Sequence, residues 1–145
     1  MKKYFFILLL STYSSLSFAT DRLNGTVWKT IDDETNQPRA IVKFSENKDG
    51  TLSAHIEKIL IPSEANQCTK CEGTYHNKSL VGLTIIRNLK SSGQNKYTKG
   101  SILDPKNGKT YSFGATLSPD GNKLSGRGYI GISAIGRSQI WHRVK

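Results

Sequence analysis

The stretch that decides the fold is residues 110–117, which read T-Y-S-F-G-A-T-L. From Tyr111 to Leu117 every second side chain is apolar, and the side chains between them are small or polar. A period of two is typical of a strand with one buried face. Turn signals lie on both sides, since Asn107-Gly108 precedes the stretch and Asp120-Gly121 follows it. The pattern therefore predicts a strand with a tight turn at each end.

Similar runs recur along the chain after residue 19, and turn residues separate one run from the next. Counting these runs gives about eight strands, and little of the sequence has the helical period. The strands are expected at residues 25–31, 38–45, 51–61, 80–89, 96–103, 109–117, 123–132 and 137–144. The sequence therefore predicts an all-β domain.

One of these runs is irregular. Leu52 and Ile56 share one phase of the alternation, whereas Ile59 and Ile61 continue it one residue late. An extra residue in one strand of an antiparallel pair produces such a slip. We therefore expect a β-bulge near Glu57–Lys58.

The regular spacing and short turns favour a single antiparallel meander. Closing a meander of about eight strands into a barrel removes both of its open edges. Gly126, Gly128 and Gly131 suit the bends of a barrel corner, and Ile130 and Ile132 favour a strand there over a loop. We expect a small closed barrel, with a β-sandwich as the alternative. Such a barrel is either filled by side chains or holds one small ligand.

Residues 1–19 have the features of a cleavable signal peptide. Two lysines come first, the apolar run Y-F-F-I-L-L-L follows, and the segment ends at the small residue Ala19. The apolar run is far shorter than the roughly 20 residues that a helix needs to span a bilayer. We therefore expect one mature barrel domain over residues 20–145, located in the periplasm or secreted, and not membrane-spanning.

The chain is basic, with 21 Lys and Arg against 11 Asp and Glu and a formal net charge of +10. Loss of Lys2 and Lys3 with the signal peptide leaves +8, because 19 basic residues then face 11 acidic ones. Such a charge favours anionic surfaces. Since an exported protein seldom meets nucleic acid, an anionic polymer of the cell envelope is the expected macromolecular partner.

Cys68-Thr69-Lys70-Cys71 lies in the one long connection between expected strands. In an oxidising compartment we expect Cys68 and Cys71 to form a disulfide. A redox motif would accompany a βαβ pattern, and a zinc site needs about four ligands, of which only His76 is near in sequence. Redox and metal-binding roles remain as the alternatives to the disulfide.

No catalytic motif is complete. Gly131-Ile132-Ser133 begins like a nucleophile elbow, but Ile135 replaces the closing glycine. The three histidines lack metal-binding spacing. We expect the acidic triplet 32–34 to be a solvated hairpin tip. The sequence therefore predicts a protein that is not an enzyme and that needs no metal or cofactor.

Polar residues on or beside the expected strands are the candidates for a polar site. Asp104, Lys109 and Tyr111 surround one turn, and Arg127 and Tyr129 lie on a later strand. An enzyme site without a known motif would use residues of this kind. The alternative is that they begin a turn or pack against the barrel.

Aromatic and arginine residues near the two ends of the mature chain are candidates for barrel closure. Trp28 lies in the first expected strand, and Arg137, Trp141 and Arg143 share one face of the last. In a closed meander those strands pair, so an arginine across the Trp28 ring would help to seal one end. The alternative is that Trp28, Trp141 and Tyr129 line a ligand cavity.

Several runs of the chain carry a family resemblance. They are W-K-T-I-D-D-E-T at 28–35, P-R-A at 38–40, Cys68-x-x-Cys71, V-G-L-T-I at 81–85, G-S-I-L-D-P at 100–105, N-G-K-T-Y at 107–111, R-G-Y-I-G-I-S at 127–133 and G-R-x-Q-x-W at 136–141. In these runs the chain resembles the bacterial exported proteins grouped as domain of unknown function 2147. The resemblance implies an exported domain of lipocalin-like character with no settled activity. The opening Gly25-x-x-Trp28 also resembles the G-x-W of lipocalins, with one extra residue.

Three functions follow as expectations. The first is a non-enzymatic binding module that holds a small apolar or amphiphilic ligand in the cell envelope. The second is a filled barrel whose basic exterior contacts anionic envelope polymers. The third is an undetected enzyme.

Overall fold

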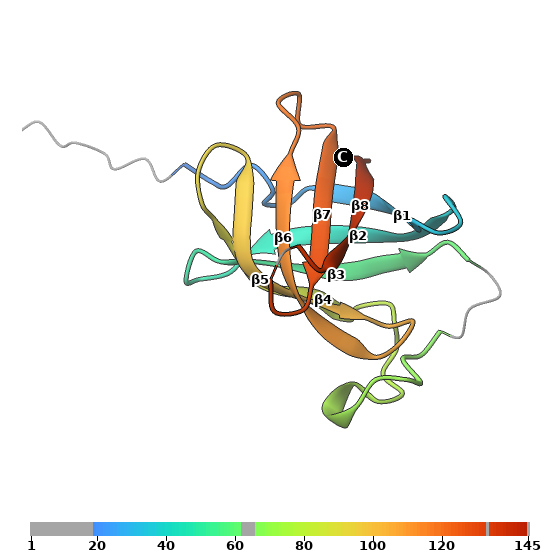
Figure 1. Cartoon of the computed structure of the whole chain (residues 1–145). Coiled ribbons are helices and arrows are strands. Elements are labelled where there is room, and N and C mark those ends of the chain that lie inside the picture. The colour runs from blue at the N-terminus through green and yellow to red at the C-terminus, as the bar shows by residue number, and fades with distance from the viewer. Residues whose placement is uncertain (1–18, 62–65, 133, 145) are drawn as a thin grey trace, which may run out of the picture.

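A computed structural model describes residues 19–61, 66–132 and 134–144, so the expected signal peptide lies outside the described residues, apart from Ala19. Eight antiparallel strands form a closed barrel in which each strand pairs with the next (Figure 1). The strands are β1 (Val27–Ile31), β2 (Pro38–Glu46), β3 (Leu52–Ile59), β4 (Thr84–Ser91), β5 (Lys96–Asp104), β6 (Lys109–Leu117), β7 (Lys123–Tyr129) and β8 (Gly136–Arg143). The predicted all-β barrel is confirmed, and the sandwich alternative is wrong.

The first and last strands close the barrel. Trp28 of β1 is opposite Arg143 of β8, and Lys29 is opposite His142. The backbone N–H of Val144 also donates to the carbonyl of Val27 at 2.7 Å. Neither edge of the meander is therefore left open, which is the physical advantage of closure.

The predicted bulge in β3 is confirmed. Ile41 of β2 is opposite Lys58, and the next residue, Val42, is opposite Ile56. Glu57 is therefore the extra residue of β3, at the position where the apolar alternation slips.

The largest differences from the predicted strand bounds are at the start of β4 and at the end of β7. β4 begins at Thr84 rather than at residue 80, because Gly82 has a φ of 88° and the N–H of Leu83 donates to the carbonyl of Leu80. β7 ends at Tyr129 rather than at residue 132. Ile130 and Ile132 lie instead in the β7–β8 turn, where 66% and 64% of their surfaces are exposed.

Side chains fill the middle of the barrel. Trp28 and Phe44 have an exposed fraction of 0% and Phe113 of 2%, so almost no part of these side chains faces a space large enough for water. A Cβ added at Gly126 would lie 2.9 Å from the Phe113 ring, which therefore rests directly on the backbone of the neighbouring strand β7. The Phe113 ring also stacks on Trp141, with centroids 6.3 Å apart. The middle of the barrel therefore offers no room for a ligand.

The segment of residues 19–26 covers one end of the barrel, called here the N-terminal end. Leu23 is fully buried there, and the indole N–H of Trp28 donates to Oγ1 of Thr26 at 2.7 Å. The hydroxyl of Tyr97 donates to Oδ1 of Asp21 at 3.0 Å. Burial and the nearby Asp21 carboxylate together raise the pKa of Tyr97 well above its usual value. Residues 19–26 therefore cover the barrel interior at this end, and the hollow of about 410 Å³ beside Asp21 and Tyr97 lies on the surface.

The connection between β3 and β4 forms an excursion, residues 66–83, that leaves the barrel and packs against its outside (Figure 1). It contains one short 3-10 helix, Gly73–Tyr75. The register pairs Ile86 with Ile102 inside the barrel, so Ile85 and Leu103 point outward. Both are nonetheless buried, because the excursion belongs to the same apolar cluster. The excursion thus covers an apolar patch on the outer wall.

Candidate ligand-binding site at the distal end of the barrel

The β1–β2 hairpin turns at the end opposite to residues 19–26, called here the distal end, and Asp32 organises it. The Asp32 side chain is nearly buried and accepts hydrogen bonds from the backbone N–H groups of Glu34 and Thr35 and from Nη1 of Arg39, all within 3.0 Å. Burial alone would raise the pKa of Asp32, but the hydrogen bonds from Thr35, Glu34 and Arg39 outweigh it and lower the pKa from 3.8 to about 2. The expectation of a solvated acidic tip is therefore wrong for Asp32.

The other two acids of the triplet fasten the hairpin across the distal end. Asp33 accepts two hydrogen bonds from Arg137 of β8, at 2.8 and 2.9 Å, and one from Gln139 at 3.1 Å. Glu34 lies 3.1 Å from Arg137 and 3.0 Å from Nζ of Lys106 in the β5–β6 turn. The Arg137 guanidinium is thus directed at the β1–β2 hairpin. The described cation–π contact places Arg87 over Tyr75 of the excursion, 4.8 Å from the ring centroid.

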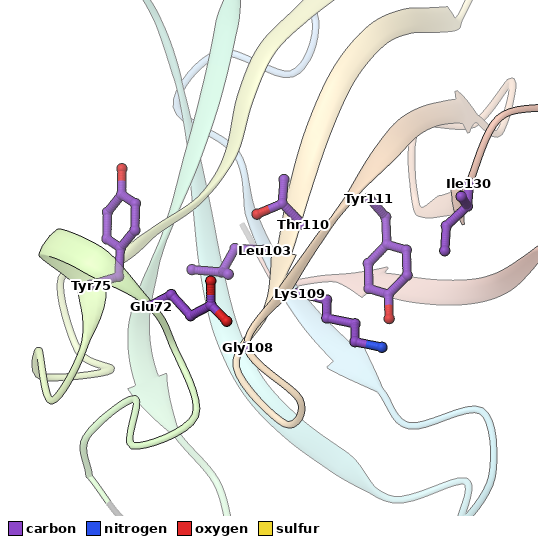
Figure 2. A pocket seen from close by; sticks show the side chains of 8 residues that line it. All are labelled: Glu72, Tyr75, Leu103, Gly108, Lys109, Thr110, Tyr111 and Ile130. Atoms are coloured by element: carbon purple, nitrogen blue, oxygen red, sulfur yellow. The ribbon is translucent and has the colours of Figure 1, made fainter.

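A hollow of about 370 Å³ opens on the surface beside this network (Figure 2). We call it the distal hollow. The excursion forms one wall, the β5–β6 hairpin forms the floor, and the β7–β8 turn adds one residue. Its lining residues are Glu72, Tyr75, Leu103, Gly108, Lys109, Thr110, Tyr111 and Ile130.

The wall of the hollow is held by a short cysteine loop. Cys68 and Cys71 lie at disulfide distance, with Cα atoms 5.3 Å apart, as the sequence predicts. Cys68 Sγ is 3.9 Å from the carbonyl of Pro105, a van der Waals contact since a disulfide sulfur carries no proton. Gly108 packs so closely on the carbonyl of Lys70 that a Cβ there would overlap it. The cysteine loop therefore seats the excursion on the β5–β6 turn.

The floor of the hollow contains two of the three polar-site candidates that surround the β5–β6 turn. Lys109 and Tyr111 line the hollow, and the hydroxyl of Tyr111 accepts a hydrogen bond from Nδ2 of Asn107 at 2.8 Å. Asp104 instead shapes the turn, because its Oδ1 accepts the backbone N–H of Lys106 at 2.9 Å. The structure thus separates Asp104 from the two residues that face the hollow.

The remaining candidates lie elsewhere. Trp28 and Trp141 are buried in the filled core. Arg127 and Tyr129 point outward from β7, because their register partners are the outward-facing Ser138 and Ser112. Arg127 donates from Nη1 to Oγ of Ser138 at 2.9 Å. None of these residues is among those that line the distal hollow.

Sequence reasoning missed most of the hollow. Glu72 and Tyr75 lie in an irregular excursion, and Leu103 belongs to a strand whose apolar alternation suggests only core packing. The one usable signal is the length of the β3–β4 connection, since long connections are commonly functional.

Within residues 19–61, 66–132 and 134–144, no group of three or more His, Cys, Asp or Glu side chains is placed to hold a metal ion. Over the same residues no helix is long and apolar enough to cross a membrane.

Comparison with known proteins assigns a family and a fold. The model of a family described as uncharacterised proteins conserved in bacteria, DUF2147, matches residues 26–143. No curated protein matches the chain. Among solved structures, the chain is similar to protein HP1028 of Helicobacter pylori, described as belonging to the lipocalin family, with 21% identity and a TM-score of 0.74. The similarity covers 85% of this chain and 83% of that one, and it supports the fold alone. With a family match across the entire barrel and a lipocalin-like fold, this chain belongs to the DUF2147 family of bacterial proteins.

Proposed function

We propose that the protein is exported and acts, without catalysing a reaction, as a binding module for a small amphiphilic molecule in the cell envelope. The molecule sits in the distal hollow rather than in the barrel. One observation carries this proposal: the barrel is filled around Phe44 and Phe113, whereas the hollow is open and has about 370 Å³. Sites for small molecules commonly have roughly 300–1,000 Å³.

The hollow combines apolar and charged surfaces. Leu103 and the rings of Tyr75 and Tyr111 offer contact area for an apolar tail, and Ile130 stands beside Tyr111 with most of its surface exposed. Covering an exposed isoleucine gains on the order of 1 kcal/mol. Lys109 and Glu72 supply opposite charges for a polar headgroup. This mixture suits an amphiphile better than a purely apolar ligand.

Export is supported by the N-terminal sequence and by the cysteine pair. Residues 1–19 follow the order of a signal peptide, and an oxidising compartment keeps Cys68 and Cys71 paired. That pair seats the excursion on the β5–β6 turn. The wall of the distal hollow therefore depends on an oxidising compartment.

Native mass spectrometry of the protein purified from its own cell envelope tests this function. We expect a chain that begins at Thr20 and carries a bound small molecule. A chain without any adduct that also takes up no fatty acid or lysophospholipid would count against the binding function. Retention of residues 1–19 would count against export.

Substitutions of two isoleucines test whether the ligand binds in the distal hollow. Ile130→Asp places a charge in the hollow, and we expect it to weaken binding about tenfold. Ile140→Asp is the matched control, because Ile140 is also exposed but lies on the outer face of β8. Phe113→Leu enlarges the barrel interior only. Binding that responds to Phe113→Leu and ignores Ile130→Asp would place the ligand in the barrel instead.

A further inference from the structure

Charge is segregated on this barrel. Within the described strands, the acidic residues are Glu46, Glu57 and Asp104, of which Glu46 and Asp104 are strand ends and Glu57 is the bulge. The other described acids lie in the turns or in the segments outside the strands. Basic residues, in contrast, occupy the middle of most strands. The outer wall is therefore cationic, whereas both ends of the barrel carry acids.

The clearest feature of this wall is a row of residues aligned across five strands. Lys123 of β7 is opposite His142 of β8, which is opposite Lys29 of β1. Lys29 is opposite Ile41 of β2, and Ile41 is opposite Lys58 of β3. Residues directly opposite one another share a face of the sheet. Because Trp28 and Val42 point inward, this row points outward, and we call it the cationic row.

The positive charge of the cationic row is not balanced by acids within the row. Lysines of β7 and β1 flank His142 on both sides, so two ammonium groups lie only two strands apart in the row. No acid occupies the row among the described residues. Asp120, in the β6–β7 turn outside the row, lies near Lys123 and offsets part of its charge, whereas Lys29 and Lys58 have no such acid described beside them in the row. An anion from outside the molecule would supply the missing negative charge.

The geometry of the row selects the kind of anion. Adjacent strands lie about 4.8 Å apart, so the four steps from Lys123 to Lys58 cover roughly 19 Å. Five of the eight strands make up about half the circumference of the barrel. A planar bilayer can touch only part of so curved a row. Duplex DNA is also too stiff to follow it, since its persistence length is about 150 base pairs. A flexible chain can wrap around the row and contact all of it.

We propose that the cationic row binds a flexible, linear acidic polysaccharide of the cell envelope. The chain runs across the strands and places its carboxylates beside Lys123, His142, Lys29 and Lys58. This surface lies on the outer wall, and none of its residues lines the distal hollow. Small-molecule binding and polymer binding are therefore separate properties of the mature protein.

Binding to polygalacturonate, a linear polymer with one carboxylate per sugar, tests the proposal, with uncharged dextran as the blank. The variant Lys29→Gln/Lys123→Gln removes two cations of the row. We expect its dissociation constant to rise about tenfold, and the slope of log K against log salt to fall by about 1.4, which is about 0.7 for each lysine removed. The control Lys90→Gln/Lys96→Gln removes the same charge from exposed positions of β4 and β5, and we expect it to bind nearly as the unmodified protein does.

Thermal unfolding of both variants establishes that the barrel is intact. Equal weakening by the two variants would show that only the total charge matters, and would overturn the proposal. So would failure of the unmodified protein to bind polygalacturonate at low salt. Binding to duplex DNA and binding to vesicles with anionic lipid are measured in the same way. Tighter binding to either of them, with the same loss in the Lys29→Gln/Lys123→Gln variant, would assign the row to that partner instead.

Discussion

Asp33, after the first strand of the barrel, and Arg137, in its last strand, form a two-pronged ion pair at 2.8 and 2.9 Å. Asp33 belongs to the β1–β2 hairpin and Arg137 to β8, so the pair joins the first hairpin to the last strand at the distal end. Two parallel hydrogen bonds fix both position and orientation, which a single ion pair does not. The pair is therefore a clasp at the end of the barrel beside the distal hollow.

We predict that Arg137→Ala lowers the free energy of unfolding by about 0.5–1 kcal/mol, because the pair is partly exposed to solvent. Asp33→Asn should cost a similar amount, and the double variant should cost less than the sum of the two. Urea unfolding measures all three. Lys43→Ala is the control, because Lys43 and Glu57 are 3.9 Å apart and exposed, so little change is expected. Full additivity of the two distal substitutions would show that the pair has no energetic coupling.

The stability of the barrel should fall in acid through Asp32. The pKa of Asp32 is lowered to about 2 in the folded protein, from an ordinary value of 3.8 for an aspartate. A carboxyl whose pKa is lower in the folded state stabilises that state above its unfolded pKa. This contribution, about 2 kcal/mol, is lost as the pH falls from about 4 to about 2.

Urea unfolding from neutral pH to pH 2 measures this loss, and Asp32→Asn is the test variant. We expect the variant to be less stable at neutral pH and to show a shallower decline between pH 4 and pH 2. A decline of unchanged steepness in Asp32→Asn would assign the acid sensitivity to other carboxyl groups, of which Asp33 also has a lowered pKa.

Gly108→Ala should detach the excursion from the barrel. Gly108 has a φ of 75°, and its Cβ would overlap the carbonyl of Lys70. Gly50→Ala is a matched control, since Gly50 has a φ of 79° and no atom within 4 Å of its Cβ position. Both variants carry a backbone penalty of about 1 kcal/mol, and only Gly108→Ala adds a steric overlap. Hydrogen exchange of residues 66–83 should therefore accelerate in Gly108→Ala alone. Equal exchange in the two variants would contradict the packing described here.

Gly126→Ala should overpack the core. Its Cβ would lie 2.9 Å from two atoms of the Phe113 ring, and overpacking of a core commonly costs about 1–3 kcal/mol. Phe113→Leu in the same chain should relieve part of that cost. Gly128→Ala serves as the comparison, because its Cβ would meet Ile102 at an ordinary 3.5 Å. Thermal unfolding distinguishes the three, and a Gly126→Ala protein as stable as the unmodified one would mean that the interior has spare room.

Most of the barrel could be predicted from sequence, because the information that fixes a strand is local. The alternation around Phe113 specifies β6, and the slip after Ile56 specifies the bulge at Glu57. Ile130 and Ile132 were misleading, since their apolar character favours a strand, whereas Gly131, with a φ of 71°, makes a turn there. Their exposure depends on where β8 begins, which the local pattern does not specify.

The distal end could not be predicted, because its contacts join residues far apart in the chain. Asp32 resembles any hairpin acid in sequence, and its burial follows from the packing of the first hairpin against the β5–β6 turn. Likewise, Tyr75 and Tyr111 face one hollow only because the cysteine loop rests on Gly108. Neither contact is marked in the sequence by a hydrophobic period or by a motif.

The pairing of β1 with β8 has a consequence for how the chain folds. The two strands that close the barrel are the first and the last to be made, so the edge of β1 stays unpaired until Gly136–Arg143 is available. Contacts between such distant parts of a chain slow folding. A chain that stops before β8 would expose two strand edges at once, and open edges promote aggregation. The pairing of the last eight residues of the meander is thus the step at which folding competes with edge-to-edge association.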